Sequence, residues 1–582
     1  MCGIIGISSK DNIKENLITC LKNLEYRGYD SVGIYLNKII KTKGRVNDLE
    51  KLMVNSNDYH IGLGHSRWAT HGEVNDTNAH PFLSFNKIFV LVHNGIIDNY
   101  LELKEELIQN NYLFYSDTDS EVICNLLDYY YLIYNDSLRA LELTLERIKG
   151  SYALGIINTK EDNKIYFARK ESPLVIGVND NYNFIVSDIN SSYFLTNRFI
   201  ILNDNEYGFI DNNDINIYHN KAKISNNIIT IDIKNKEISK GEYEHFMLKE
   251  IFDEPKVLKR ILDTYTLDNK IIISDNLIND LKNSKEINIL GCGTSYHAGL
   301  IGKEIIERLV KKRVNVILAS EYNNYHLLDK DSVYLFLSQS GETIDLKMAS
   351  NYINNKIYTF TNVLTSSLAR LASEAFDLCS DIEIAVASTK AYVSEVALLT
   401  MLAYKLIDKD KEYIDNIYYC INSINKVLND KDKALEIAKK IKDSSSLFFI
   451  GRGMDHFINK ESSLKLKEIS YIHVEALFGG ELKHGTIALV SKDINVIGLI
   501  TSKDNLSLLS NIKEVEARKA NVTLISTSNL NIDSTYVIPC VNELFAPLIC
   551  ASFFQLISYY TAKLNNKDID KPRNLAKSCT VI

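Results

Sequence analysis

Short apolar runs dominate the first part of the chain, up to about residue 235, and helical patterns separate them. The runs CGIIGI, VGIYL, KIFVLVHNG, YALGII and FIVSD have the length and composition of buried strands. Between them, ENLITCLKNLEY and YLELKEELIQNN place apolar residues at helical spacing. Short strands mixed with helices predict an α+β domain of stacked layers over residues 1–235.

The next segment, ISKGEYEHFMLKEIFDEP (Ile238–Pro255), is polar at first and then helical. Because proline interrupts a helix interior, we expect this helix to stop at Pro255. We therefore interpret residues 236–255 as a linker.

From about residue 285, apolar strands alternate with longer helices, which is typical of a doubly wound parallel sheet. The strands INILGCGTS, VYLFLSQSGET and IYTFTN are each followed by a helical segment. The pattern restarts at SLFFIGRGMD, which again ends an apolar strand in G-x-G, and NVIGLITSKDN lies where VYLFLSQSGET would repeat. The pattern predicts two related α/β subdomains, residues 256–425 and 426–565. The second lacks the hydroxyl-rich turn SQSGET of the first. A C-terminal tail, residues 566–582, follows.

Composition and charge exclude several classes of protein. The net charge of −8 is modest, and the basic residues form no stripe along the chain, so no nucleic-acid partner is expected. No apolar run reaches the roughly 20 residues of a membrane span, and no signal region begins the chain, so no membrane is expected. The nine cysteines are odd in number, widely spaced and without C-x-x-C. This pattern disfavours disulfides and a zinc site and favours a reducing cytoplasm. No metal or cofactor is expected.

Cys2 directly follows the initiator methionine. If Met1 is removed, the thiol and a free α-amine belong to one residue, and the amine can act as the base for the thiol. Asn94 and Gly95 follow an apolar strand, and their side-chain amide and backbone N–H are suitable donors to an oxyanion. Taken singly, Cys2 is more often structural, and Asn94-Gly95 is typical of a hairpin turn.

Arg67 and Asp119 are suited to hold the two ends of an α-amino acid. The planar guanidinium fork matches a carboxylate, and the Asp119 carboxylate can pair with an ammonium group. The neighbouring His65, Trp68 and His71 would, by default, be structural or packing residues.

The turn SQSGET places Ser338, Gln339, Ser340 and Thr343 between a strand and a helix, with Ser295 in the related G-x-G turn. Backbone N–H groups and the positive end of a helix favour an anion there, so this turn is a candidate phosphate cradle. A helix N-cap with a capping-box acid is an equally compatible interpretation.

Four further residues are candidates for a functional role. Lys465 and Glu468 lie three apart, as in many surface ion pairs of helices. His484 lies in the glycine-rich segment GGELKHG, where catalytic groups often occur. Lys577, near the C-terminus, would by default be a solvated lysine.

The motifs MCGIIG, LEYRGYDSVGI, GHSRWATHGEVNDTNAHP, VHNGIIDN and SDTDSE resemble, in residues and order, the glutaminase domain of N-terminal-nucleophile amidotransferases. The resemblance implies a domain of αββα layers in which Cys2 attacks the glutamine amide, releases ammonia and forms a thioester that is hydrolysed. Asn94 and Gly95 would form the oxyanion hole. The glutamine-binding residues implied in this way are Arg67, Trp68, Thr70, His71 and Asp119.

The motifs CGTS, SQSGET, VASTKAY, LKLKEISYIHVEA, GGELKHG and PRNLAKS resemble the two sugar-isomerase (SIS) subdomains of the glucosamine-6-phosphate synthase family. This resemblance covers essentially the whole chain and implies conversion of fructose 6-phosphate and glutamine into glucosamine 6-phosphate and glutamate. It further implies an ammonia channel between the two sites.

By the same resemblance, Lys577 forms an imine with the keto sugar and Glu468 moves a proton between carbons 1 and 2. Lys465 assists this step. His484 of the partner subunit assists ring opening in an obligate homodimer. The implied sugar-phosphate residues are Thr294, Ser295, Ser338, Gln339, Ser340, Thr343, Val386, Ser388 and Ala576.

Three alternatives stay open at this point. The acceptor can be a different sugar phosphate. A non-catalytic sugar-phosphate sensor would need neither Cys2 nor Lys577 and usually carries a helix-turn-helix, which the sequence does not suggest. An enzyme that makes phosphoribosylamine would need a pyrophosphate-binding loop, which the sequence also lacks.

Overall fold

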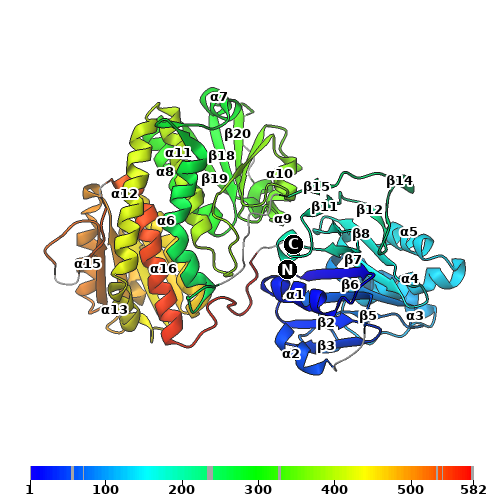
Figure 1. The fold of residues 1–582 in the computed structure, drawn as a ribbon. Coiled ribbons are helices and arrows are strands. Elements are labelled where there is room, and N and C mark those ends of the chain that lie inside the picture. The colour runs from blue at the N-terminus through cyan, green and yellow to red at the C-terminus, as the bar shows by residue number, and fades with distance from the viewer. Residues whose placement is uncertain are drawn as a thin grey trace. The chain divides into compact units, whose positions relative to one another are not determined.

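The structure is a computed structural model, and it describes residues 2–53, 58–69, 71–231, 240–324, 330–532, 535–540 and 542–577. The chain divides into two compact units, the first built from the N-terminal residues up to 237 and the second from residues 238–577 (Figure 1).

The first unit contains two antiparallel sheets. The eight-stranded sheet has the order β15 (Ile229–Thr230), β11 (Arg198–Ile201), β9 (Val175–Val178), β10 (Tyr182–Val186), β1 (Gly3–Ser9), β4 (Ile61–Arg67), β2 (Ser31–Tyr35) and β3 (Ile39–Lys43). The seven-stranded sheet has the order β14 (Ala222–Ile224), β13 (Ile215–His219), β12 (Glu206–Ile210), β8 (Ile165–Lys170), β7 (Gly150–Asn158), β6 (Phe89–Ile97) and β5 (Phe82–Leu83).

Strand β1 shows why these sheets stack. Successive side chains of a strand point to opposite faces, and every residue of β1 is buried. Ile4 joins the core between the two sheets, whereas Ile5 and Ile7 pack with helix α1 (Lys14–Leu24) on the other face. The other helices of the unit are α2 (Val46–Leu52), α3 (Tyr100–Gln109), α4 (Ser120–Tyr134) and α5 (Ser137–Arg147).

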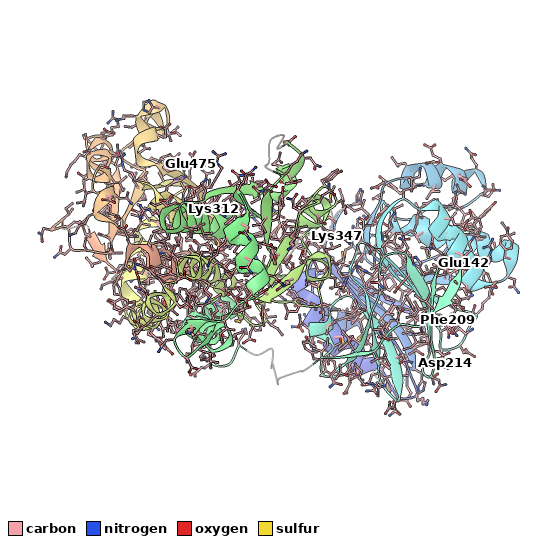
Figure 2. All side chains as sticks on the ribbon, turned by 90° about the horizontal axis from the view of Figure 1, so that it is seen from above. Glu142, Phe209, Asp214, Lys312, Lys347 and Glu475 are labelled. Atoms are coloured by element: carbon pink, nitrogen blue, oxygen red, sulfur yellow. The ribbon has the colours of Figure 1, made fainter. Side chains whose placement is uncertain are left out.

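Helix α4 supplies Val122, Ile123 and Leu126 to the outer core of the seven-stranded sheet. Glu142 of α5 accepts a hydrogen bond from the Tyr207 hydroxyl of β12 at 2.8 Å, which ties α5 to the same sheet (Figure 2). The order helix, sheet, sheet, helix confirms the predicted stacked αββα layers.

The second unit contains two five-stranded parallel sheets with the same strand order. The first has the order β19 (Arg313–Leu318), β18 (Glu286–Gly291), β20 (Ser332–Leu337), β21 (Ile357–Thr361) and β22 (Glu374–Asp377). The second has the order β24 (His473–Phe478), β23 (Ser446–Gly451), β25 (Asn495–Ile500), β26 (Asn521–Ser526) and β27 (Thr535–Val537). A short hairpin, β16 (Thr266–Leu267) with β17 (Lys270–Ile271), lies outside both. Two related subdomains with parallel sheets are therefore confirmed.

The helices that cover these sheets are α6 (Phe246–Tyr265), α7 (Asp275–Asn283), α8 (Thr294–Val310), α9 (Ile344–Ser350), α10 (Ser367–Leu371), α11 (Lys390–Leu406), α12 (Asp410–Asn429), α13 (Asp432–Ile441), α14 (Met454–Ser470), α15 (Leu508–Glu516) and α16 (Ala546–Leu564). Most of them share one large apolar core, whereas α9 and α10 pack in a second cluster and α15 in a third. Lys312, labelled in Figure 2, donates from its ammonium to the carbonyl of Lys282 at 2.8 Å, and so satisfies the C-terminal end of α7.

The prediction that a helix stops at Pro255 is wrong, because α6 continues through this residue to Tyr265. Proline removes one backbone hydrogen bond, but α6 buries residues on both sides of it, including Ile251 and Leu258, in the core. Packing therefore outweighs the local preference. The N-terminus of α6 is capped from far along the chain, since the Asp570 carboxylate accepts the N–H groups of Phe246 and Met247 at 2.9 Å each.

Helix α16, with the short turn before it, is long and apolar enough to pass a test for a membrane span. However, 89 % of its most apolar stretch is buried inside the second unit, as in the core helix of a folded domain. It therefore gives no support for a membrane span.

Candidate active sites

Cys2 lies just before β1, at the end of the pairing between β1 and β4. This pairing sets Gly3 opposite Ser66, so Cys2 lies beside the end of β4, where Arg67 and then Trp68 follow. The Trp68 N–H donates to the Cys2 sulfur at 3.2 Å, and the thiol lies 3.4 Å from the Trp68 carbonyl oxygen. Burial raises the pKa of the Cys2 thiol, and the charged amino terminus and the Trp68 N–H oppose this effect.

Asn94 is held between Cys2 and a buried histidine. Its Nδ2 donates to the Cys2 carbonyl oxygen at 3.0 Å, and its Oδ1 lies 3.0 Å from Nε2 of His65. The same Nε2 lies 3.0 Å from the carbonyl oxygen of His93. Both oxygens only accept hydrogen bonds, so Nε2 carries the proton. Burial lowers the pKa of His65 to about 3, which keeps the ring neutral.

Gly95 is part of β6 and pairs with Tyr152 of β7, so Asn94-Gly95 is not the hairpin turn that its composition suggests. Its φ of +137° is in the region that favours glycine, and an added Cβ would lie 2.0 Å from the Ser151 carbonyl oxygen. No other residue fits at this point.

Arg67, at the end of β4, donates to the carbonyl oxygens of Gly72 at 3.4 Å and Glu73 at 3.3 Å. Asp119, at the N-terminus of α4, accepts the Ile97 N–H at 2.8 Å. Burial lowers the pKa of Arg67, whereas the nearby Cys2, Asp30 and Asp119 raise it. Arg67 therefore lies within electrostatic reach of both Cys2 and Asp119.

The structure thus brings together most of the predicted glutamine-site residues: Cys2, Arg67, Trp68, Asn94, Gly95 and Asp119. The His71 ring packs edge-on against Tyr100, with the centroids 5.7 Å apart. Thr70 lies outside the described residues. Sequence reasoning treated His65 as structural and missed its contact with Asn94.

In the second unit, Lys465 of α14 is only 1 % exposed, so it is not the surface ion pair that its spacing suggests. Its ammonium lies 2.7 Å from the Glu468 carboxylate and donates to the Thr294 hydroxyl at 3.0 Å. Burial lowers the pKa of Lys465, but Glu468 and Glu461 together raise it above its usual range. Lys465 is therefore a buried cation.

Glu461 completes this group and was not predicted. Its carboxylate accepts the Thr294 hydroxyl at 3.1 Å and lies 2.8 Å from Nδ1 of His297. The signal was present in the sequence, because Glu461, Lys465 and Glu468 recur at helical spacing on one face of α14.

Lys577 forms an ion pair with Glu383, and both side chains are buried. Glu383 also accepts the Ser388 hydroxyl at 2.7 Å and the N–H groups of Thr389 at 2.9 Å and Ala391 at 3.1 Å, at the N-terminus of α11. Burial alone would raise the pKa of Glu383, but Lys577 and these hydrogen bonds hold it at about 2. The interpretation of Lys577 as a solvated tail lysine is therefore wrong, and Glu383 is a site residue that the sequence did not reveal.

Other predicted residues lie around this pair. Ser295 donates to Glu395 at 2.7 Å. The Val386 N–H donates to the Asp570 carbonyl oxygen at 3.0 Å, which ties the tail before Ala576 and Lys577 to the loop before α11.

The turn after β20 is built as a hydroxyl-rich loop. The hydroxyls of Ser338 and Thr343 lie 2.9 Å apart, and the Gly341 N–H donates to the Ser338 hydroxyl at 3.0 Å. Glu342 accepts the Ser367 N–H at 2.8 Å, at the start of α10, so it does not complete a capping box for α9. Gln339 and Ser340 lie in the same turn.

His484 ends the 3₁₀ helix Gly479–His484 and is exposed. Among the described residues, the structure shows no hydrogen bond or ion pair between it and the other predicted site residues. Exposure is what a residue that acts on another chain requires.

Two family models match the chain. The SIS domain model matches residues 280–405 and 440–538, and a glutamine amidotransferase domain model matches residues 65–191. The glutamine–fructose-6-phosphate aminotransferase (isomerizing) of Staphylococcus epidermidis is 42 % identical over 602 residues, which span 100 % of both chains. The chain belongs to this aminotransferase family. The Bacillus cereus member of the family is 40 % identical over 600 residues, again across 100 % of both chains.

A solved structure agrees with this assignment for the second unit. The C-terminal domain of glucosamine-fructose-6-phosphate aminotransferase from Francisella tularensis is 32 % identical to the chain, with a TM-score of 0.54. It covers 57 % of this chain and 99 % of that one. The predicted fold, an amidotransferase domain followed by two SIS subdomains, is confirmed.

Proposed function

We propose that this chain carries out the reaction named in its relatives. It transfers the amide nitrogen of glutamine to fructose 6-phosphate and isomerises the sugar, giving glucosamine 6-phosphate and glutamate. The observation that carries this proposal is the similarity to these aminotransferases over 100 % of the chain. The two groups of buried residues described above supply a chemistry for each half-reaction.

In the first unit, Cys2 attacks the glutamine amide carbon once Met1 has been removed, and its own α-amine takes the thiol proton. Asn94 Nδ2 and the Gly95 N–H stabilise the oxyanion. Collapse of the intermediate releases ammonia and leaves a thioester, which water hydrolyses to glutamate. Arg67 binds the glutamine carboxylate and Asp119 its ammonium group, and Arg67 lies within electrostatic reach of both Cys2 and Asp119.

In the second unit, the amine of Lys577 adds to the keto carbon, carbon 2, and water leaves, which gives an imine. Ammonia released by the first site then adds to carbon 2 and the lysine amine leaves, so the glutamine nitrogen stays on the sugar. Glu468 then moves a proton between carbons 1 and 2, with Lys465 beside it at 2.7 Å. The hydroxyls of Ser338 and Thr343 bind the phosphate. Because Lys577 forms an ion pair with Glu383, its side chain must leave this carboxylate before it can add to the sugar.

The remaining parts of the proposal concern assembly and location. The chain acts as a homodimer in which His484 of the partner subunit assists ring opening, and it acts in the cytoplasm. The exposure of His484 supports the first of these statements.

The experiment that tests the function compares the unmodified chain with Cys2→Ala. With glutamine and fructose 6-phosphate, only the unmodified chain should form glucosamine 6-phosphate, while the variant still isomerises the sugar phosphate or uses added ammonia. If the unmodified chain hydrolyses glutamine but makes no amino sugar, the acceptor is a different sugar phosphate. If protein whose N-terminus is confirmed as Cys2 uses neither substrate, a sugar-phosphate sensor becomes the better interpretation.

A further inference from the structure

The two SIS subdomains can be aligned residue by residue from their sheets. Strands β18 and β23 end in the same turn, in which Gly293 has φ 53° and ψ −120° and Gly453 has φ 50° and ψ −129°. Each glycine directly precedes a helix, α8 or α14, so Ser295 of the first subdomain corresponds to Asp455 of the second.

The neighbouring strands fix the second half of the alignment. Val333 of β20 lies opposite Ile287, and Asn495 of β25 lies opposite Leu447, which is the equivalent of Ile287. Counting forward from Val333 and Asn495, Gln339 corresponds to Thr501. In the same way, Ser340 corresponds to Ser502 and Thr343 to Asn505. The turn after β25 therefore lies where the first subdomain has its hydroxyl-rich turn.

The Asp455 side chain occupies this second turn. Its carboxylate accepts the Thr501 N–H at 3.2 Å and an amide hydrogen of Asn505 at 2.6 Å, and the Thr501 hydroxyl donates to its other oxygen. The two residues that donate to Asp455, Thr501 and Asn505, are thus the equivalents of Gln339 and Thr343.

Asp455 is 0 % exposed, and no lysine, arginine or histidine of the described residues forms an ion pair with it. Burying a carboxylate without a cation is costly unless hydrogen-bond donors surround it. Neutral N–H and O–H donors between a parallel strand and a helix N-terminus are also the usual way to hold a phosphate. Burial raises the pKa of Asp455 to about 6, and the bonds from Thr501 and Asn505 oppose this effect.

An ordinary acid in the first turn of a helix does not explain this arrangement. Such an acid stabilises the helix from a position exposed to water. Asp455 is instead buried and bonded to a different strand. In the first subdomain, Ser295 donates to Glu395 at 2.7 Å, and the Thr343 hydroxyl bonds with Ser338 instead of a carboxylate.

We infer that the second SIS subdomain keeps an anion cradle of the class that binds inorganic phosphate or a phosphate monoester, and that the Asp455 carboxylate fills it from within. The comparison rests on the proposed function, because that function assigns phosphate binding to the turn in the first subdomain. Removal of the carboxylate should therefore open a second anion site.

The test counts bound inorganic phosphate per full-length chain by equilibrium dialysis. Asp455→Ser places at this position the residue that occupies the equivalent position 295, and circular dichroism checks that the variant is folded. It should bind one phosphate more than the unmodified chain. The control, Asp504→Ser, removes an exposed acid from the same turn and should add none. A folded Asp455→Ser chain with no additional phosphate overturns the inference.

The count also separates the two proposals. An unmodified chain that binds no phosphate contradicts the role given to Ser338 and Thr343, whereas the additional phosphate of Asp455→Ser still supports the inference. If Asp455→Ser does not fold, Ser295→Asp is compared with the size-matched Ser295→Asn. The carboxylate should displace phosphate from the first cradle and the amide should not. Equal effects of the two changes, or an unmodified chain without phosphate, then overturn the inference.

Discussion

The two proposed nucleophiles lie in contrasting surroundings. Cys2 lies in a buried environment, and burial raises the pKa of its thiol. Trp68 and Asn94 bond to it, and the charges of Arg67 and Asp30 act on it without forming an ion pair. Lys577 instead forms an ion pair with Glu383, within a group of buried acids. Burial is therefore the largest influence on the first nucleophile, whereas a direct ion pair holds the second.

The largest effect should come from Lys577→Arg. Arginine keeps the positive charge beside Glu383 but cannot form the imine. Formation of glucosamine 6-phosphate should fall by about 10³-fold or more, the scale on which loss of a covalent nucleophile is felt. Hydrolysis of glutamine and the melting temperature should stay near those of the unmodified chain. A variant that still forms glucosamine 6-phosphate at more than about one tenth of the original rate would contradict the proposal that Lys577 forms an imine.

The matching change in the first site is His65→Phe. It removes the donor that orients the Asn94 amide, so kcat for glutamine hydrolysis should fall by about 10- to 100-fold, less than the loss of a whole oxyanion donor. KM for glutamine should change little, because His65 does not touch the substrate. His65→Gln, which keeps an N–H donor, should recover part of kcat. His80→Phe is the control, because His80 stacks on His65 with the centroids 4.0 Å apart without holding Asn94.

The smallest effect concerns the buried acids of the second unit. Burial raises the pKa of Glu254 from an ordinary 4.5 to about 8, and hydrogen bonds from Ser552 and Gln555 oppose it. The folded chain therefore binds a proton that the unfolded chain has lost, and this acid lowers stability as pH rises between those two values. Glu254→Gln imitates the protonated form. Its melting temperature should equal that of the unmodified chain in mild acid and exceed it near pH 8.

The difference near pH 8 should be measured by calorimetry and should correspond to roughly 1–2 °C for each kcal/mol, because the unfolding entropy of so large a unit is high. Glu412→Gln, in a side chain that is 44 % exposed, is the control and should give no pH-dependent difference. A melting-temperature difference that is the same at both pH values would show that Glu254 is ionised in the folded chain.

Local patterns in the sequence were sufficient for the layers and the parallel sheets. They failed where a distant contact decides the outcome. Pro255 continues a helix because that helix is buried in a core built from the whole second unit. Asn94-Gly95 continues a strand because β7 pairs with it.

The same limit applies to single side chains. Lys465 has the spacing of a surface ion pair, yet a helix from the first SIS subdomain covers it and brings the Thr294 hydroxyl to its ammonium. Glu383 meets Lys577 across 194 positions of sequence, which no local spacing encodes. Asp455 is a further case, because only the strand register shows which residues of the two subdomains correspond.

Asp570 links the two ends of the second unit, since its carboxylate caps the first helix and its carbonyl oxygen holds the loop before α11. Chains leave the ribosome in order, and domains fold as units during synthesis, the N-terminal ones first. The glutaminase unit can therefore fold while the rest is still being made. Helix α6, in contrast, is made long before its cap, because Asp570 follows Phe246 by 324 positions, so the second unit completes its fold later than the first.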